Sequence, residues 1–131
     1  KGRHEPAAVI AAQTMGMLGG EPQASLLGSR EKTSLFNAAL VNGTAGHVLD
    51  FDDTHLEALG HPSVCILPAA LAYAEWQKLN GARLLEAYLV GFEFWCRISL
   101  SMGEPIMMRA GIPPPPWAAL EPQPQWVSLW A

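Results

Sequence analysis

The feature that most constrains this chain is the apolar periodicity of residues 82–100. Apolar side chains recur there at intervals of three and four, at Leu84, Leu85, Tyr88, Leu89, Phe92, Trp95 and Cys96. That spacing places them on one face of an α-helix, and Glu93 and Arg97 add an i,i+4 ion pair. We find no convincing alternation of period two, which a half-buried strand would show. The sequence therefore predicts an all-α fold.

Three further helices are expected upstream, over residues 6–18, 35–49 and 63–79. Pro6 suits the first turn of the first helix, and Thr33 or Ser34 can cap the second. Pro68 lies inside the third and predicts a kink or a later start, because proline lacks a backbone N–H. Residues 21–30 are expected to form a loop or a short extended piece.

Composition excludes several classes of protein. The 131 residues are 50% hydrophobic and carry a net charge of −4, which argues against a disordered chain and against nucleic-acid binding. No stretch reaches the roughly 18 apolar residues that favour a membrane span, and no signal peptide opens the chain. Cys65 and Cys96 lie apart in apolar surroundings, which favours a reducing compartment over a disulfide. We expect a cytoplasmic protein with no membrane partner.

The composition changes near Gly103. Most of the eleven prolines and three of the five tryptophans follow this point. Proline at that density blocks helix interiors and central strands. We therefore expect a helical domain over residues 1–104 and an irregular Pro-rich tail over residues 105–131.

Chemistry-bearing residues concentrate between residues 42 and 63. This segment holds three of the four histidines and three aspartates, namely His47, His55, His61, Asp50, Asp52 and Asp53. The residues could bind a divalent metal, perform acid–base catalysis, or simply cap a helix and solvate a loop. The metal interpretation is the weakest from the pattern, because the segment has neither an EF-hand series nor an HExxH motif.

Three stretches carry a resemblance to a known family: "NGTAGHVLDFDDTH", "GHPSVCILPAALAYAE" and "NGARLLEAYLVGFEFWCRI". Together they resemble the MmgE/PrpD family over residues 8–104. That family includes 2-methylcitrate dehydratases, cis-aconitate decarboxylases and iminodisuccinate epimerases. The resemblance implies a homodimeric enzyme with a large helical and a smaller α+β domain. It also implies proton abstraction beside a carboxylate of a small polycarboxylate substrate, with no required metal and no cofactor.

The resemblance also assigns site residues. His61 and Asp50 would be catalytic, and Thr54 and His61 would bind substrate. These roles are chemically reasonable, because a polyanionic substrate needs N–H and O–H donors and a histidine can move protons near neutral pH. Asp50 would fix the imidazole tautomer or hold a proton near the substrate.

Neighbouring polar residues receive structural roles. We assign Asp52 and Asp53 to helix capping and loop hydrogen bonds. His47 is expected to be packed in the core or to lie near the site. Asn42 and Gly43 are expected to serve close helix packing.

The tail departs from the family. After "SMGEP" the family continues with a motif close to H-Y-D-x-G-W-H-P-T-A-T-L-G. Back-translated and read one base out of frame, that motif gives the segment Ile106–Trp117, so we interpret the tail as a frameshift. The motif's second histidine is then replaced at Gly111–Ile112. Because the chain also lacks a starting Met, we expect a fragment of the domain that is inactive alone. The alternative is a non-catalytic helical module whose Pro-rich tail binds a partner domain.

Overall fold

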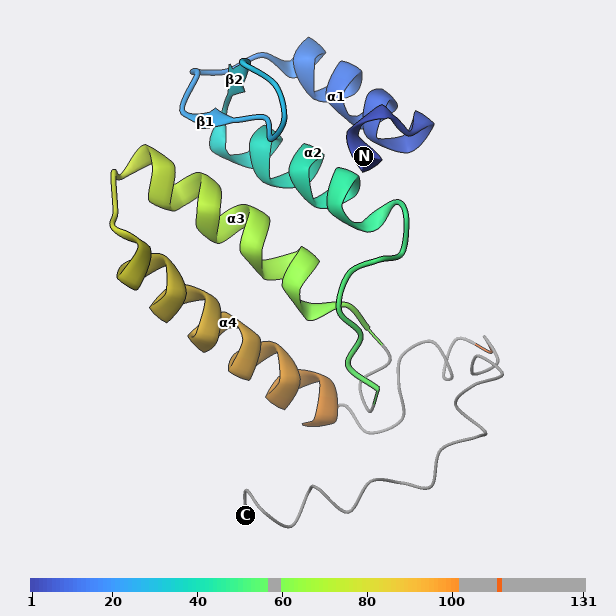
Figure 1. The fold of residues 1–131 in the computed structure, drawn as a ribbon, viewed down its shortest axis with the longest axis vertical. Helices are drawn as coiled ribbons and strands as arrows, with labels where there is room; N and C mark the ends of the chain where they lie inside the picture. The colour runs from blue at the N-terminus through green and yellow to red at the C-terminus, as the bar shows by residue number, and fades with distance from the viewer. Residues whose placement is uncertain (57–59, 102–110, 112–131) are drawn as a thin grey trace.

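The computed structural model describes residues 1–56, 60–101 and 111. Its elements are η1 (Gly2–His4), α1 (Pro6–Leu18), β1 (Ala24–Ser25), β2 (Lys32–Thr33), α2 (Leu35–His47), α3 (Pro62–Trp76) and α4 (Gly81–Ser101). The four helices lie side by side in a row in the order α1, α2, α3, α4, and each is antiparallel to the next (Figure 1). The predicted all-α class is confirmed, since the sheet in the described residues has only two strands.

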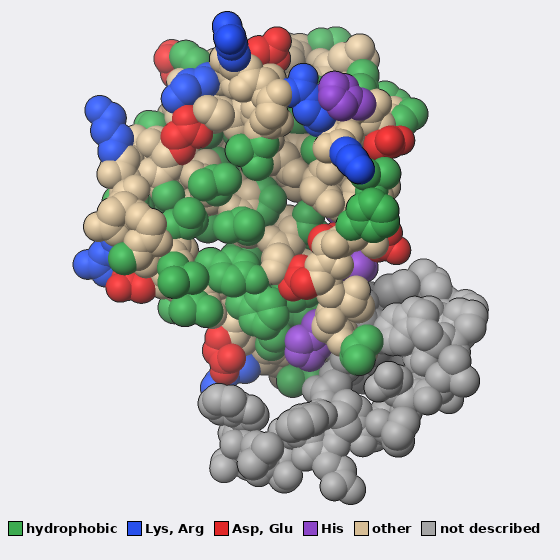
Figure 2. Space-filling view, in the orientation of Figure 1, with side chains coloured by type: hydrophobic (Ala, Val, Ile, Leu, Met, Phe, Trp, Pro, Cys, Tyr) green, Lys and Arg blue, Asp and Glu red, His purple; other side chains and the backbone are tan. Residues whose placement is uncertain are grey.

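The row of helices explains an unusual distribution of apolar residues. Its buried core is made of small side chains, Ala24, Ala38 and Ala72, with Leu35 packed against them. Small residues let the backbones approach closely, but each helix of a single row keeps two sides that no neighbouring helix covers. Large apolar side chains are therefore exposed in the described part of the chain; Phe36 is 86% and Phe94 65% exposed. Figure 2 shows hydrophobic side chains gathered over α3 and α4.

The short hairpin is fastened to α2 by a buried asparagine. β1 pairs antiparallel with β2, with Ala24 opposite Thr33. The Asn42 Oδ1 accepts from Leu27 N at 2.8 Å, and its Nδ2 donates to Ser25 O at 3.0 Å. These two bonds attach the backbone of the hairpin to the buried Asn42 side chain. The predicted helix-packing role of Asn42 was wrong: it holds the hairpin.

The helix boundaries agree with local chemistry. All four predicted helices form, and the Ser34 hydroxyl, rather than Thr33, caps α2 by accepting from Asn37 N. Pro68 lies inside α3 and does not delay its start: the helix begins at Pro62, which suits the first turn because no N–H is needed there. The helix expected to extend to residue 79 ends at Trp76.

Two predictions about the C-terminal part of the chain concern residues that the structure does not describe. The boundary near residue 103 and, apart from Gly111, the tail of residues 105–131 lie outside the described residues.

Within the described ranges, no helix has the length and apolar character to cross a membrane. Cys65 and Cys96 are free thiols.

Candidate functional site

The candidate site is the connection between the two middle helices of the row, where α2 ends and α3 begins (Figure 1). Helix α2 ends at His47, and Asp50 then adopts a left-handed conformation with φ 55°. Aspartate tolerates this region better than most residues. The turn is closed by Asp50 N donating to His47 O at 2.7 Å. His61 stands at the N-cap of α3, so two helix ends bring His47 and His61 together.

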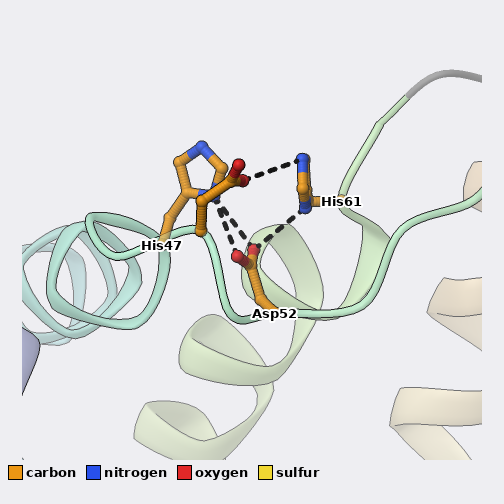
Figure 3. A group of neighbouring side chains, drawn as sticks. His47, Asp52 and His61 are labelled. Atoms are coloured by element: carbon orange, nitrogen blue, oxygen red, sulfur yellow. Dashed lines mark hydrogen bonds and ion pairs between the residues drawn. The ribbon is translucent and has the colours of Figure 1, made fainter. Parts of the chain in front are cut away.

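Asp52 lies at the centre of the cluster, which consists of His47, Asp50, Asp52 and His61 (Figure 3). Its side chain is 11% exposed, and its carboxylate lies between the two imidazoles. His47 Nδ1 is 3.0 Å from Asp52 Oδ2, and His61 Nδ1 is 3.4 Å from the same oxygen. The other ring nitrogen of His61, Nε2, is 3.5 Å from Asp50 Oδ1. His61 therefore has a carboxylate beside each nitrogen.

A second polar group ties the site to α4. Asp53 accepts from Ser63 N at 3.2 Å and from Ser63 Oγ at 2.8 Å. Ser63 Oγ is also 2.6 Å from the Tyr88 hydroxyl. The bond to Ser63 N satisfies one of the free N–H groups of the first turn of α3. Asp53 thus makes the expected hydrogen bond to a helix end, although the N-cap residue of α3 is His61.

Sequence comparison places this chain among known proteins. The model of the MmgE/PrpD N-terminal domain matches residues 1–110. The chain belongs to the MmgE/PrpD family. The human cis-aconitate decarboxylase is 46% identical over 65 residues, which are 47% of this chain and 13% of that protein.

A second relative of this MmgE/PrpD chain aligns over a longer stretch. The cis-aconitate decarboxylase-like protein oryM of Aspergillus oryzae is 31% identical over 108 residues, which are 77% of this chain and 22% of that protein. The chain thus spans about a fifth or less of the length of these relatives. No solved structure matches it.

Two of the three site residues expected from the MmgE/PrpD motifs come together. Asp50 and His61 are adjacent, whereas Thr54 is exposed and takes no part in the contacts that join the cluster. Asp52, expected only to cap or to bind the loop, is the central residue. His47 is near the site but about half exposed, so the core alternative for it was wrong.

The cluster combines two imidazoles, which can carry protons, with two carboxylates, which can carry negative charge. With both imidazoles neutral, the two carboxylates give it a charge of −2, and protonating both imidazoles brings it to zero. Such a group can take up and release protons. Its four donor atoms, one from each residue, lie within 4.8 Å of one another, so the same residues could also hold a cation.

Proposed function

We propose that this chain carries one wall of the active site of a MmgE/PrpD-type lyase or isomerase that acts on small polycarboxylates. The observation that carries the proposal is the contact of His61 with Asp50 and Asp52, in a chain that belongs to this family. The relatives named as cis-aconitate decarboxylases make cis-aconitate the first substrate to assay. The reaction class is acid–base chemistry next to a carboxylate, like that of 2-methylcitrate dehydratase.

His61 is the group we propose to move the proton. Its side chain is 25% exposed, so substrate can reach it from solvent. Asp52 Oδ2 lies 3.4 Å from Nδ1, an ion-pair distance without a hydrogen bond. A small rotation of the ring would let Asp52 orient it, and an oriented imidazole is a better base than a freely rotating one. Asp50 lies beside Nε2 and is mostly exposed. It can accept or return the same proton at the edge of the site.

A substrate with several carboxylates needs donors rather than acceptors. Protonated imidazoles offset the charges of Asp50 and Asp52 and present N–H groups to the substrate. The Thr54 hydroxyl, on the exposed part of the same loop, would donate to one substrate carboxylate. In a dehydratase the substrate then loses water, and in an epimerase the proton returns to the carbon. In a decarboxylase the substrate instead loses CO₂, and a proton is delivered to the carbanion that remains.

We further propose that the 131-residue chain is inactive alone. Catalysis depends on donors and acids held around the developing charge before reaction, and this chain covers at most 22% of the curated relatives it matches. One wall of a cleft also leaves the substrate in water, where its hydrogen bonds are weak.

The test compares this chain with a protein in which the reading frame after Pro105 is restored together with the downstream sequence. We expect cis-aconitate turnover only in the restored protein. His61→Ala there should lower kcat by about 10²–10⁴-fold, the usual effect of losing an acid–base group. His4→Ala is the matched control, because His4 lies in η1 and outside the cluster. Full activity of His61→Ala and Asp50→Asn, or turnover by the 131-residue chain, would contradict the proposal.

A further inference from the structure

We propose that His47, Asp50, Asp52 and His61 form a binding site for a divalent transition-metal ion of the zinc type. The four residues come from the end of α2, the loop and the N-cap of α3. Each offers one ligand atom, and these atoms lie within 4.8 Å of one another. The two imidazoles also approach closely, with ring centroids 4.7 Å apart.

The distances within the cluster fit tetrahedral coordination. Zinc bonds to histidine nitrogen and carboxylate oxygen at about 2.0–2.2 Å, so neighbouring ligands of a tetrahedral site are about 3.3–3.6 Å apart. His61 Nδ1 lies 3.4 Å from Asp52 Oδ2, and His47 Nδ1 lies 3.0 Å from the same oxygen. One ion can therefore reach His47, Asp52 and His61 Nδ1 with small side-chain shifts. Asp50 Oδ1 lies beside the other ring nitrogen of His61, Nε2, which cannot bind the same ion, so the 78% exposed Asp50 side chain would have to rotate to complete the shell.

An open ligand atom supports this interpretation independently. His61 Nδ1 is buried and has no hydrogen-bond partner, the one such side-chain atom among the described residues. A buried polar atom without a partner costs free energy, and a metal ion would satisfy it. Asp52 Oδ2 lies 3.4 Å from this nitrogen, but the contact is an ion pair without hydrogen-bond geometry.

The donor set selects the kind of ion. With neutral imidazoles the cluster carries a charge of −2, which a dication neutralises. Two nitrogen donors disfavour Ca²⁺ and Mg²⁺, which prefer oxygen ligands, and favour Zn²⁺, Co²⁺ or Cu²⁺. Because the ion would bind His61 and Asp52, which the proposed function uses to move the proton and to orient the ring, it would inhibit rather than assist turnover. This last consequence rests on the proposed function, whereas metal binding does not.

The experiment is calorimetric titration of the purified 131-residue chain with Zn²⁺ in a buffer that does not bind metals. We expect one equivalent to bind, and His47→Gln or Asp52→Asn to weaken binding by at least about tenfold. Glu86→Gln, which changes an exposed carboxylate on α4, is the matched control. Cys65→Ser tests the exposed free thiol and should leave binding unchanged.

A second measurement does not depend on any variant folding. Adding Co²⁺ to the unaltered chain should give the visible absorption of a tetrahedral ion, and should shift the ring resonances of His47 and His61 but not those of His4.

Any of three results would overturn the proposal. The first is no binding at about 1 mM Zn²⁺, which corresponds to a standard binding free energy weaker than about −4 kcal/mol. The second is binding that survives both cluster variants, and the third is binding that Cys65→Ser abolishes. None of these readouts uses turnover, so failure of the metal site and failure of the proposed enzyme activity are distinguishable.

Discussion

Glu75 should contribute a pH-dependent part of the stability of this chain. It lies near the end of α3 and joins the hairpin to that helix. Its carboxylate is 2.7 Å from Lys32 Nζ, and it accepts from Ser25 Oγ at 2.7 Å and from Ser25 N at 2.8 Å. The Lys32 ammonium first, and then the Ser25 donors, lower the pKa of Glu75 from 4.5 to about 2.

The magnitude follows from linkage between protonation and folding. A shift from 4.5 to about 2 corresponds to about 3 kcal/mol if it applies in full. The side chain of Lys32 is 48% exposed and that of Glu75 31%, so solvent screens the pair. We therefore expect Glu75→Gln to lower the free energy of unfolding by about 1–2 kcal/mol at pH 7.

The sign of the pH dependence is fixed by the direction of the shift. The folded state binds the proton more weakly than the unfolded state does. The stabilisation is therefore present above about pH 4.5 and is lost as the pH falls toward about 2. The difference between the original chain and Glu75→Gln should close over that range, in urea unfolding followed by circular dichroism.

A surface ion pair on α4 provides the control. Arg83 and Glu86 are 2.7 Å apart, but their side chains are 67% and 62% exposed. Glu86→Gln should change the free energy of unfolding by less than about 0.5 kcal/mol and show little pH dependence. A Glu75→Gln variant that behaves like this control, or whose deficit persists unchanged at pH 2, would refute the reasoning.

Two further predictions concern packing and capping, and thermal unfolding can test both. Gly43→Ala should be neutral or stabilise α2 by up to about 1 kcal/mol, because a Cβ there meets nothing closer than Val64 O at 3.4 Å. Gly91→Ala should instead lower the melting temperature, because a Cβ there would lie 2.8 Å from Ile66 Cγ2. Ser34→Ala should cost about 0.5–1 kcal/mol through the lost N-cap of α2, and Ser34→Asp should restore it.

Much of the fold could be predicted because each helix carries its own local signals. The i, i+3/i+4 pattern of residues 84–99 and the capping serine at position 34 act over a few residues, and α4 and α2 form where these signals predict. The hairpin was harder to predict, because it depends on contacts between distant residues. Nothing local to Asn42 indicates that its amide will bind the backbone of Ser25 and Leu27.

The central position of Asp52 escaped prediction for a conformational reason. Had α2 continued, the residue four positions after His47, Phe51, would have shared its face. Instead the helix ends at His47, and Asp50 then adopts a left-handed conformation. The chain then reverses, Phe51 is left 85% exposed, and Asp52 reaches the His47 ring. Glycine at position 50 would have signalled such a turn, but aspartate does not. A motif can therefore name Asp50 and His61, whereas the carboxylate placed between the two imidazoles becomes visible only once the turn is built.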